Sequence, residues 1–148
     1  MKPRVSVVIA TYNYAQYLAG AINSALEQSF GDLEVVVVDD GSTDYTPEVM
    51  AAYAHDPRAR YIRTVNQGQP AAENVGVRHA QGEFVAFLDA DDLWLPLKLQ
   101  RQIDKFGSDA ELGVVYSRRL RIDPQGRRLL DRPRAAFRGR VVPHMFRN

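Results

Sequence analysis

Residues 83–92, with the sequence EFVAFLDADD, place five apolar residues directly before three carboxylates. An apolar run of this kind, preceded by Gly82, predicts a β-strand that is buried on both faces of a sheet. Carboxylates at the end of such a strand repel one another and lose hydration unless a cation lies between them. Mg²⁺ and Mn²⁺ prefer oxygen ligands, and Mg²⁺ usually takes one or two carboxylates together with substrate phosphates. The stretch therefore predicts a metal–phosphate site. The alternative is an acidic loop in which Asp92 caps the next helix.

Two other predicted strands also end on polar residues. The β-branched run 4–10 leads into Thr11-Tyr12-Asn13, and the apolar run 33–38 leads into the sequence DDGSTD at 39–44. Ligands of open α/β sheets bind outside the carboxyl ends of the strands. In a parallel sheet these ends share one edge, so we expect the three polar segments to converge on one ligand.

Helical spacing of apolar residues alternates with the strand-like runs. It predicts helices from Asn13 as N-cap to about residue 26, from Thr46 to about 54, from Pro70 to Gly82, and from Leu95 to about 106. Further strands are predicted at 60–65, near an edge of the sheet, at 112–116, and before a turn at 123–126. This alternation predicts an α/β fold, with a Rossmann-like and mostly parallel central sheet flanked by helices.

Composition places the chain among ordinary globular domains. It has 148 residues, 45% of them hydrophobic and 25% charged, and it contains no cysteine. No apolar run reaches the roughly 20 residues that a membrane-spanning helix needs, and the start, MKPR, has no signal-peptide pattern. We therefore expect a cytoplasmic protein, with peripheral association at the cytoplasmic face of the membrane as an open alternative.

Charge is distributed unevenly along the chain. Residues 118–148 contain ten arginines against two aspartates, although the whole chain has a net charge of only +1. Such a segment is suited to phosphate, nucleic acid or an anionic membrane surface. We prefer a solvated segment that begins an acceptor-side region, and we expect no nucleic-acid partner. The predicted organisation is a nucleotide-sugar-binding domain at 1–117 followed by this basic region at 118–148.

Taken together, the polar strand ends resemble the signature of family 2 glycosyltransferases. The resemblance covers about residues 4–117, and its motifs follow the order of the family: VSVVIATYN at 5–13, VDDGSTD at 38–44, Asn66-x-Gly68, Asn74-x-Gly76 and FLDADD at 87–92. It implies the GT-A fold and an inverting enzyme of the kind that makes cell-surface polysaccharide. The donor would be a nucleotide-diphospho-sugar, with UDP as the expected nucleotide, and the acceptor a saccharide or a lipid-linked molecule.

The resemblance also implies a nucleoside site at the first two strand ends. Thr11 and Tyr12 would lie beside the nucleobase and the ribose, with Asn13 next to them. Asp39 would accept a hydrogen bond from the imide N–H of uracil, a role that suits a carboxylate because it only accepts. Asp40 is a further candidate for donor binding, or it orders its own loop.

A metal site is implied after residue 88. Asp91 is the expected ligand of Mn²⁺ or Mg²⁺, which would bridge the donor diphosphate. Asp89 would face the ribose or the metal, with Ala90 between the two carboxylates, and Asn74 is a further donor contact. Where the family often carries an arginine just before this asparagine, the chain has Glu73. Either Glu73 points away from the diphosphate or another cation, such as Arg78, takes over.

The general base stays unassigned. An acceptor hydroxyl must lose a proton as it attacks, so a base within hydrogen-bond reach is required. In the family this base is a carboxylate well downstream of the Asp-x-Asp motif, whereas the acidic residues after Asp92 here are Asp104, Asp109, Glu111, Asp123 and Asp131. We expect donor binding without the base.

Two other classes of function remain as alternatives. One is a non-catalytic module that binds a nucleotide sugar. The other is a phosphoryl-transfer or receiver-type α/β domain, because such domains also place acids at strand ends. The second is disfavoured, because the first strand ends in Thr-Tyr-Asn and the chain has neither a Walker phosphate loop nor a dinucleotide-binding glycine motif.

Overall fold

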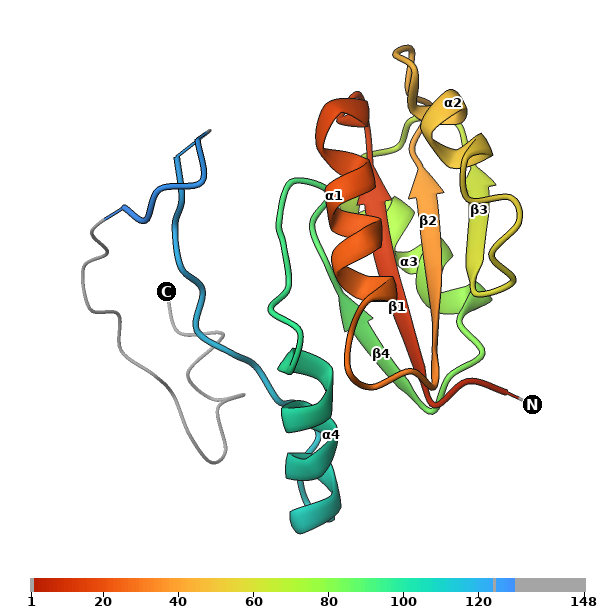
Figure 1. Ribbon diagram of the computed structural model, residues 1–148. Coiled ribbons are helices and arrows are strands. Elements are labelled where there is room, and N and C mark those ends of the chain that lie inside the picture. The colour runs from red at the N-terminus through yellow and green to blue at the C-terminus, as the bar shows by residue number, and fades with distance from the viewer. Residues whose placement is uncertain (1, 124, 130–148) are drawn as a thin grey trace, which may run out of the picture. The chain divides into compact units, whose positions relative to one another are not determined.

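The computed structural model describes residues 2–123 and 125–129 (Figure 1). The described residues fall into two units, one up to Val115 and one from Tyr116 onward. The first unit holds every named helix and strand. Asp131, one of the candidates for the general base, lies outside the described residues.

A four-stranded parallel sheet forms the centre of the first unit. Its strands are β1 (Val5–Thr11), β2 (Leu33–Asp39), β3 (Ala59–Arg63) and β4 (Phe84–Phe87), arranged in the order β3-β2-β1-β4. The predicted α/β class, the parallel sheet and the edge position of β3 are thus confirmed. All three polar strand ends lie at the same edge of this sheet.

Helices cover both faces of the two central strands. On one face lie α1 (Ala15–Leu26) and α2 (Thr46–Ala51), and on the other lies α3 (Gln69–His79) (Figure 1). The valines of β1 and β2 are buried on both sides, as continuous apolar runs require. At Gly76, α3 approaches β1 so closely that a Cβ atom there would overlap the side chain of Val8.

The prediction that the strand before the acidic motif is buried on both faces was wrong. One face of β4 packs Phe84 against Phe106 of α4 (Lys98–Ser108), with ring centroids 4.7 Å apart. On its other face, Val85 is 38% exposed and Phe87 is 53% exposed. This face of β4 is exposed because β4 lies at the edge of the described sheet. The helix on that face, α3, covers β1 and β2 instead.

Other predicted boundaries also differ. Residues 112–116, predicted as a strand, pair with no strand among the described residues, so that prediction was wrong. Among the described residues of the second unit, an antiparallel bridge joins Ile122 to Arg128 across a turn at Gly126. The fourth helix begins at Lys98 rather than near Leu95.

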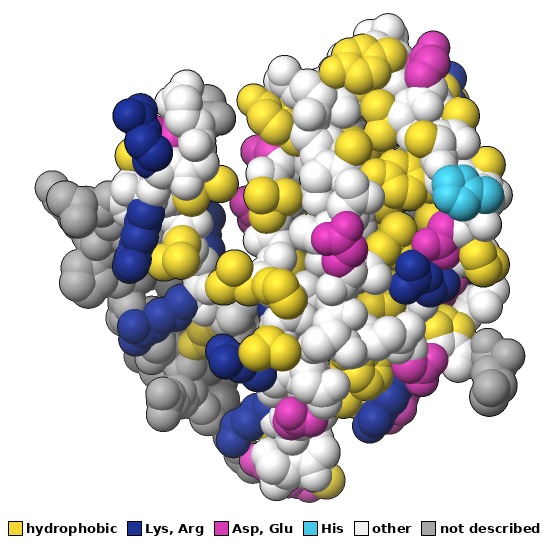
Figure 2. Space-filling view, in the orientation of Figure 1, with side chains coloured by type: hydrophobic (Ala, Val, Ile, Leu, Met, Phe, Trp, Pro, Cys, Tyr) yellow, Lys and Arg dark blue, Asp and Glu magenta, His cyan; other side chains and the backbone are white. Residues whose placement is uncertain are grey.

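Hydrophobic side chains also gather on the surface of the first unit. Figure 2 shows hydrophobic side chains around α2 and β3, where Pro47, Met50 and Tyr61 help to line a shallow hollow. Among the described residues, no helix combines the length and the apolar character that crossing a membrane requires.

A buried polar cluster joins the amino-terminal ends of the strands. Glu34 is only 5% exposed, and its Oε1 accepts hydrogen bonds from the Ser6 hydroxyl at 2.6 Å and from the Gln81 N–H at 2.7 Å. Its Oε2 accepts a bond from Arg60 Nη1 at 3.0 Å. Burial alone would raise the pKa of Glu34, but these donors outweigh it and hold the pKa below its ordinary value of 4.5.

We expect Glu34→Gln to lower the free energy of unfolding by about 1–2 kcal/mol at pH 7, because a buried charged acceptor becomes a neutral one. A folded-state pKa below the unfolded value stabilises the fold above about pH 4.5, and this contribution is lost as the pH falls through the folded pKa. Urea titrations at pH 7 and at pH 3 should therefore show the difference between wild type and variant shrinking in acid. Glu83→Gln is the control, because Glu83 is 65% exposed and its ion pair with Arg4 is 3.6 Å long. Equal losses for the two variants would contradict the assignment.

Candidate functional site

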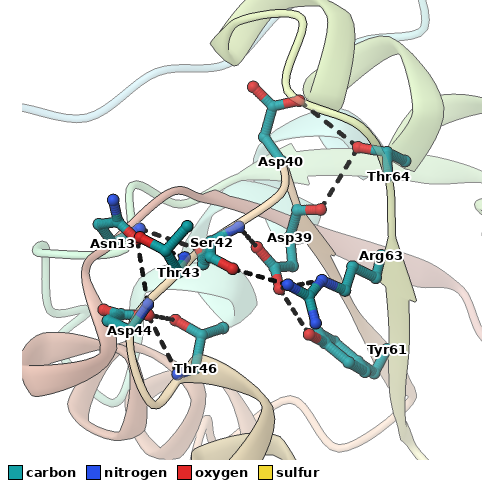
Figure 3. A network of polar contacts seen from close by, with 10 residues as sticks. All are labelled: Asn13, Asp39, Asp40, Ser42, Thr43, Asp44, Thr46, Tyr61, Arg63 and Thr64. Atoms are coloured by element: carbon teal, nitrogen blue, oxygen red, sulfur yellow. Dashed lines mark hydrogen bonds and ion pairs between the residues drawn. The ribbon is translucent and has the colours of Figure 1, made fainter.

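Two consecutive carboxylates end β2, and they point to opposite faces of the sheet. Figure 3 shows Asp39 directed toward Tyr61 and Arg63 of β3, while Asp40 is directed toward Thr64. We call the loops that surround them, residues 11–13, 39–44, 64–69 and 89–92, the carboxyl edge.

Asp40 organises the loop between β3 and α3. Its Oδ1 accepts the N–H of Gln67 at 3.0 Å, and its Oδ2 accepts the N–H of Gly68 at 2.7 Å. Gly68, with a positive φ of 91°, is the N-cap residue of α3. Asp40 thereby fixes the start of α3, with Asn74 lining a hollow of about 250 Å³ beside it.

Asp39 is completely buried and receives donors on both of its oxygens. The Ser42 N–H donates to Oδ1 at 2.7 Å, and the Tyr61 hydroxyl donates to Oδ2 at 2.6 Å. Arg63 Nε lies 3.6 Å from Oδ2, while Arg63 Nη2 donates to the Ser42 carbonyl at 2.7 Å. The side chains of β3 therefore tie Asp39 to the 41–44 loop (Figure 3).

Asn13 does not cap α1, so that prediction was wrong. Tyr14 occupies the N-cap position, and Asn13 adopts a left-handed backbone with a φ of 57°. Its N–H donates to Ser42 Oγ at 3.0 Å, and its Oδ1 accepts the Thr43 N–H at 2.8 Å. Asn13 thus binds the neighbouring loop, a contact that cannot be inferred from helical spacing.

The Ala15 N–H at the start of α1 donates across the carboxyl edge to the loop after β2. Asp44 accepts the Ala15 N–H at 3.0 Å through Oδ2, and it accepts the Thr46 hydroxyl at 2.6 Å through Oδ1. Burial would raise the pKa of Asp44, but these hydrogen bonds lower it overall. One carboxylate therefore holds the starts of α1 and α2 together.

The end of β1 presents one buried and one exposed side chain. Thr11 pairs with Asp39 in the sheet, is only 4% exposed, and its hydroxyl has no hydrogen-bond partner among the described residues. A buried hydroxyl without a partner costs about 1–3 kcal/mol, so it is a natural place for a ligand group. Tyr12, the next residue, is 45% exposed.

The Asp-x-Asp segment is anchored through its middle residue. Ala90 is 6% exposed and belongs to the hydrophobic core, whereas Asp89 and Asp91 are exposed. The Asp92 N–H donates to the Asp89 carbonyl at 3.1 Å, which closes a turn. The alternative in which Asp92 caps the next helix was wrong, because α4 begins six residues later with Leu97 at its N-cap position.

Glu73 faces the acidic segment rather than away from it. Gln69 Nε2 donates to Glu73 Oε1 at 2.9 Å and to Asp89 Oδ1 at 3.2 Å, so one carboxamide bridges the two acids. Arg78 lies on the other flank of α3, where it lines the hollow beside Asp40 and Asn74. The structure therefore separates Asn74 and Arg78 from Asp89.

The described carboxylates after Asp92 have local roles. Asp104 accepts a bond from Gln100, Asp109 accepts the Glu111 N–H, and Asp123 is paired with Arg127. Asp104, Asp109 and Glu111 lie on or just after α4, while Asp123 belongs to the second unit. The hydrogen bonds of Asp104 and Asp109 stay on or beside α4.

Three residues of the site were not singled out from the sequence. Tyr61 and Arg63 occur at alternate positions of β3, so they share a face, and Asp44 follows the DDGS motif. The sequence shows that Tyr61 and Arg63 alternate along β3. Their contact with Asp39, however, depends on β3 lying beside β2. That order of strands is a property of the fold.

The acidic groups of the carboxyl edge have a chemistry that suits a hard dication. Asp89 and Asp91 offer only oxygen donors, and both are exposed to an approaching ligand. Within residues 2–123 and 125–129, no three acidic, histidine or cysteine residues are grouped so that they alone could hold a metal ion. Two exposed carboxylates match the one or two that Mg²⁺ usually takes from a protein, with its remaining ligands from phosphate or water.

Comparison with known proteins gives a consistent result. The family described as Glycosyl transferase family 2 matches residues 6–144. An uncharacterized glycosyltransferase of Nostoc sp. is 47% identical over 115 residues, covering 76% of this chain and 36% of the relative. Chondroitin synthase of Escherichia coli is 39% identical over 125 residues, covering 84% of this chain and 18% of the relative. The chain thus spans about a third or less of the length of these relatives.

Solved structures agree with the sequence comparison. S. aureus TarS 1–349 in complex with UDP-GlcNAc has a TM-score of 0.66 and 35% identity, covering 73% of this chain and 32% of that one. The mannosyltransferase PcManGT from Pyrobaculum calidifontis, in complex with GDP-Man and Mn²⁺, has a TM-score of 0.67 and 34% identity, covering 76% and 34%. The structural neighbours are GT-A glycosyltransferases, so the fold predicted from the strand-end motifs is confirmed.

We expect Asp44→Ala to lower the free energy of unfolding by about 1–2 kcal/mol, because the start of α1 loses its cap. Denaturant unfolding followed by circular dichroism measures the loss. Asp32→Ala is the control, because Asp32 is exposed and lies before β2, at the opposite edge of the sheet. If both substitutions change stability by less than about 0.5 kcal/mol, Asp44 does not carry the cap.

Proposed function

Because the chain belongs to glycosyl transferase family 2, we propose that its carboxyl edge binds a UDP-sugar through a divalent metal, for inverting transfer of the sugar to an acceptor hydroxyl. One observation carries this proposal: Thr11, Asp39 and the 89–92 segment come from the ends of β1, β2 and β4 and meet at one edge of the sheet. The complexes of the two structural neighbours with nucleotide sugars support the choice of ligand.

Strand order sets where each part of the donor would bind. The ends of β2 and β4 lie two strand spacings apart, on the order of 10 Å, with β1 between them. The nucleobase would lie at the β2 end, near Asp39 and Tyr12. The diphosphate would lie at the β4 end, near Asp91 and Asp89. Thr11, on the strand between them, would give its unpartnered hydroxyl to the nucleoside.

Asp91 would hold the metal, with Asp89 in support. A bound Mn²⁺ or Mg²⁺ would supply Lewis-acid stabilisation of the charge that grows on the departing diphosphate. Glu73 adds negative charge near Asp89, because the Gln69 carboxamide donates to both carboxylates. Since the cation Arg78 lies on the opposite flank of α3, we assign it no part in neutralising the diphosphate.

A second candidate, a donor-binding module without transfer activity, is favoured by the described carboxylates. Asp104 and Asp109, which follow Asp92 in the first unit, accept their hydrogen bonds locally, from Gln100 and from the Glu111 N–H. We propose that residues 1–117 form the donor domain and that residues 118–148 begin an acceptor-side region. The acceptor would be a saccharide or a lipid-linked molecule, reached in the cytoplasm or at the cytoplasmic face of the membrane.

We expect UDP together with Mn²⁺ to raise the melting temperature more than UDP alone. A ligand at about 100 times its Kd stabilises a protein by about 2.7 kcal/mol. Asp91→Ala should abolish the increment that depends on Mn²⁺, because it removes the main metal ligand. A thermal-shift titration with and without Mn²⁺ measures both effects, and Asp32→Ala should behave like wild type. An increment that survives in Asp91→Ala would rule out this ligand assignment.

Donor binding and transfer separate the two candidate functions. We expect the 148-residue chain to bind a UDP-sugar in calorimetry but to release no product when acceptor saccharides are added. Chromatography of the reaction mixture, together with an assay for free UDP, detects both transfer and donor hydrolysis. Measurable transfer to an acceptor would show that the chain contains its own general base.

A further inference from the structure

Asp39 is held by two side chains of β3 whose function is not yet assigned. In register, Tyr61 pairs with Val37 and Arg63 pairs with Asp39, so both side chains lie on the face of Asp39. Tyr61 reaches Asp39 diagonally along the ladder, which is within range for an aromatic side chain. No other strand borders β2 on this side.

The hydrogen-bond donors around Asp39 hold its carboxylate in one orientation, in which it can still accept a hydrogen bond. The Ser42 N–H, the Tyr61 hydroxyl and the Arg63 guanidinium all face the carboxylate, at 2.7, 2.6 and 3.6 Å. Each carboxylate oxygen has two lone pairs, so each can accept one more hydrogen bond. Burial, together with the hydrogen bond to the neighbouring Asp39 carboxylate, raises the pKa of Tyr61, which favours the protonated hydroxyl that donates to Asp39.

We propose that Tyr61 is a positioning residue, supported by Arg63, that holds Asp39 as an acceptor and thereby selects nucleobases with a ring N–H. This inference rests on the proposed function. On the Watson–Crick edge of the base, uracil and guanine present a ring N–H. Cytosine presents a ring nitrogen acceptor there, which a carboxylate repels. Since the two solved neighbours hold UDP-GlcNAc and GDP-Man, one rule for the base covers both.

Arg63 is the most exposed of the residues whose donors hold Asp39. The Asp39 side chain has no exposed surface, whereas the side chain of Arg63 is 53% exposed. Its contact with Asp39 is the longest of the three, but Arg63 Nη2 also donates to the Ser42 carbonyl at 2.7 Å, so a movement of Arg63 would break both contacts. Tyr61, with the shorter bond, stays in place and keeps the carboxylate oriented while the base approaches.

The test compares UDP with CDP by calorimetry in the presence of Mn²⁺, using Tyr61→Phe in the full chain. We expect wild type to bind UDP at least about tenfold more tightly than CDP. Tyr61→Phe should weaken UDP binding by about tenfold and leave CDP binding nearly unchanged, so that the UDP/CDP ratio collapses. Tyr17→Phe is the matched control, because Tyr17 lies on the exposed side of α1, 47% exposed.

The ratio distinguishes positioning from a general loss of structure. A variant that is merely destabilised would bind both nucleotides less well at the same ratio, and its melting temperature without ligand would report the change. If Tyr61→Phe preserves the UDP/CDP ratio, the inference is overturned while the proposed function stands. If wild type does not bind UDP with Mn²⁺, the proposed function fails first.

Discussion

The structure depends on a backbone constraint at the end of β2: two adjacent carboxylates must point to opposite faces of the sheet. Asp39 turns toward the 41–44 loop and β3, and Asp40 turns toward the loop that starts α3. Each carboxylate accepts backbone N–H groups that would otherwise have no partner in a loop. A buried N–H or carboxylate left unpaired costs more than a typical hydrogen bond gains, so the two loops are fixed together.

This constraint explains how the carboxyl edge stays ordered while carrying so much negative charge. Asp39, Asp40 and Asp44 are all engaged by donors of the chain itself and belong to its framework. Asp89 and Asp91, after β4, are exposed, and Ala90 between them is anchored in the core. The acids thus divide into a group near β2 that donors of the chain hold in place, which includes the proposed base acceptor Asp39, and an exposed group near β4. That division matches a donor with an uncharged base at one end and a diphosphate at the other.

The sheet and the place of the site could be predicted because their signals are local. Runs of Val and Ile mark the strands, and polar residues directly after them mark the edge where a ligand binds. The burial of the strand at 84–88 was predicted wrongly, because burial depends on the order of the strands in the sheet. An apolar run such as 84–88 looks the same at an edge as in the centre of a sheet. Tyr61 lies 22 residues from Asp39, and Asp44 lies 29 residues from the Ala15 N–H that it accepts. Helical or strand spacing does not predict such contacts.

The central claim is that a metal-bound nucleotide lies across the ends of β2, β1 and β4. Nuclear magnetic resonance of the ¹⁵N-labelled chain tests it most directly, because Mn²⁺ broadens the signals of nearby amides. With UDP present, substoichiometric Mn²⁺ should broaden the amides of residues 89–92 most strongly, while those at the opposite edge of the sheet, near Asp32 and Gly82, stay sharp. Broadening centred elsewhere, or none at residues 89–92, would contradict the account.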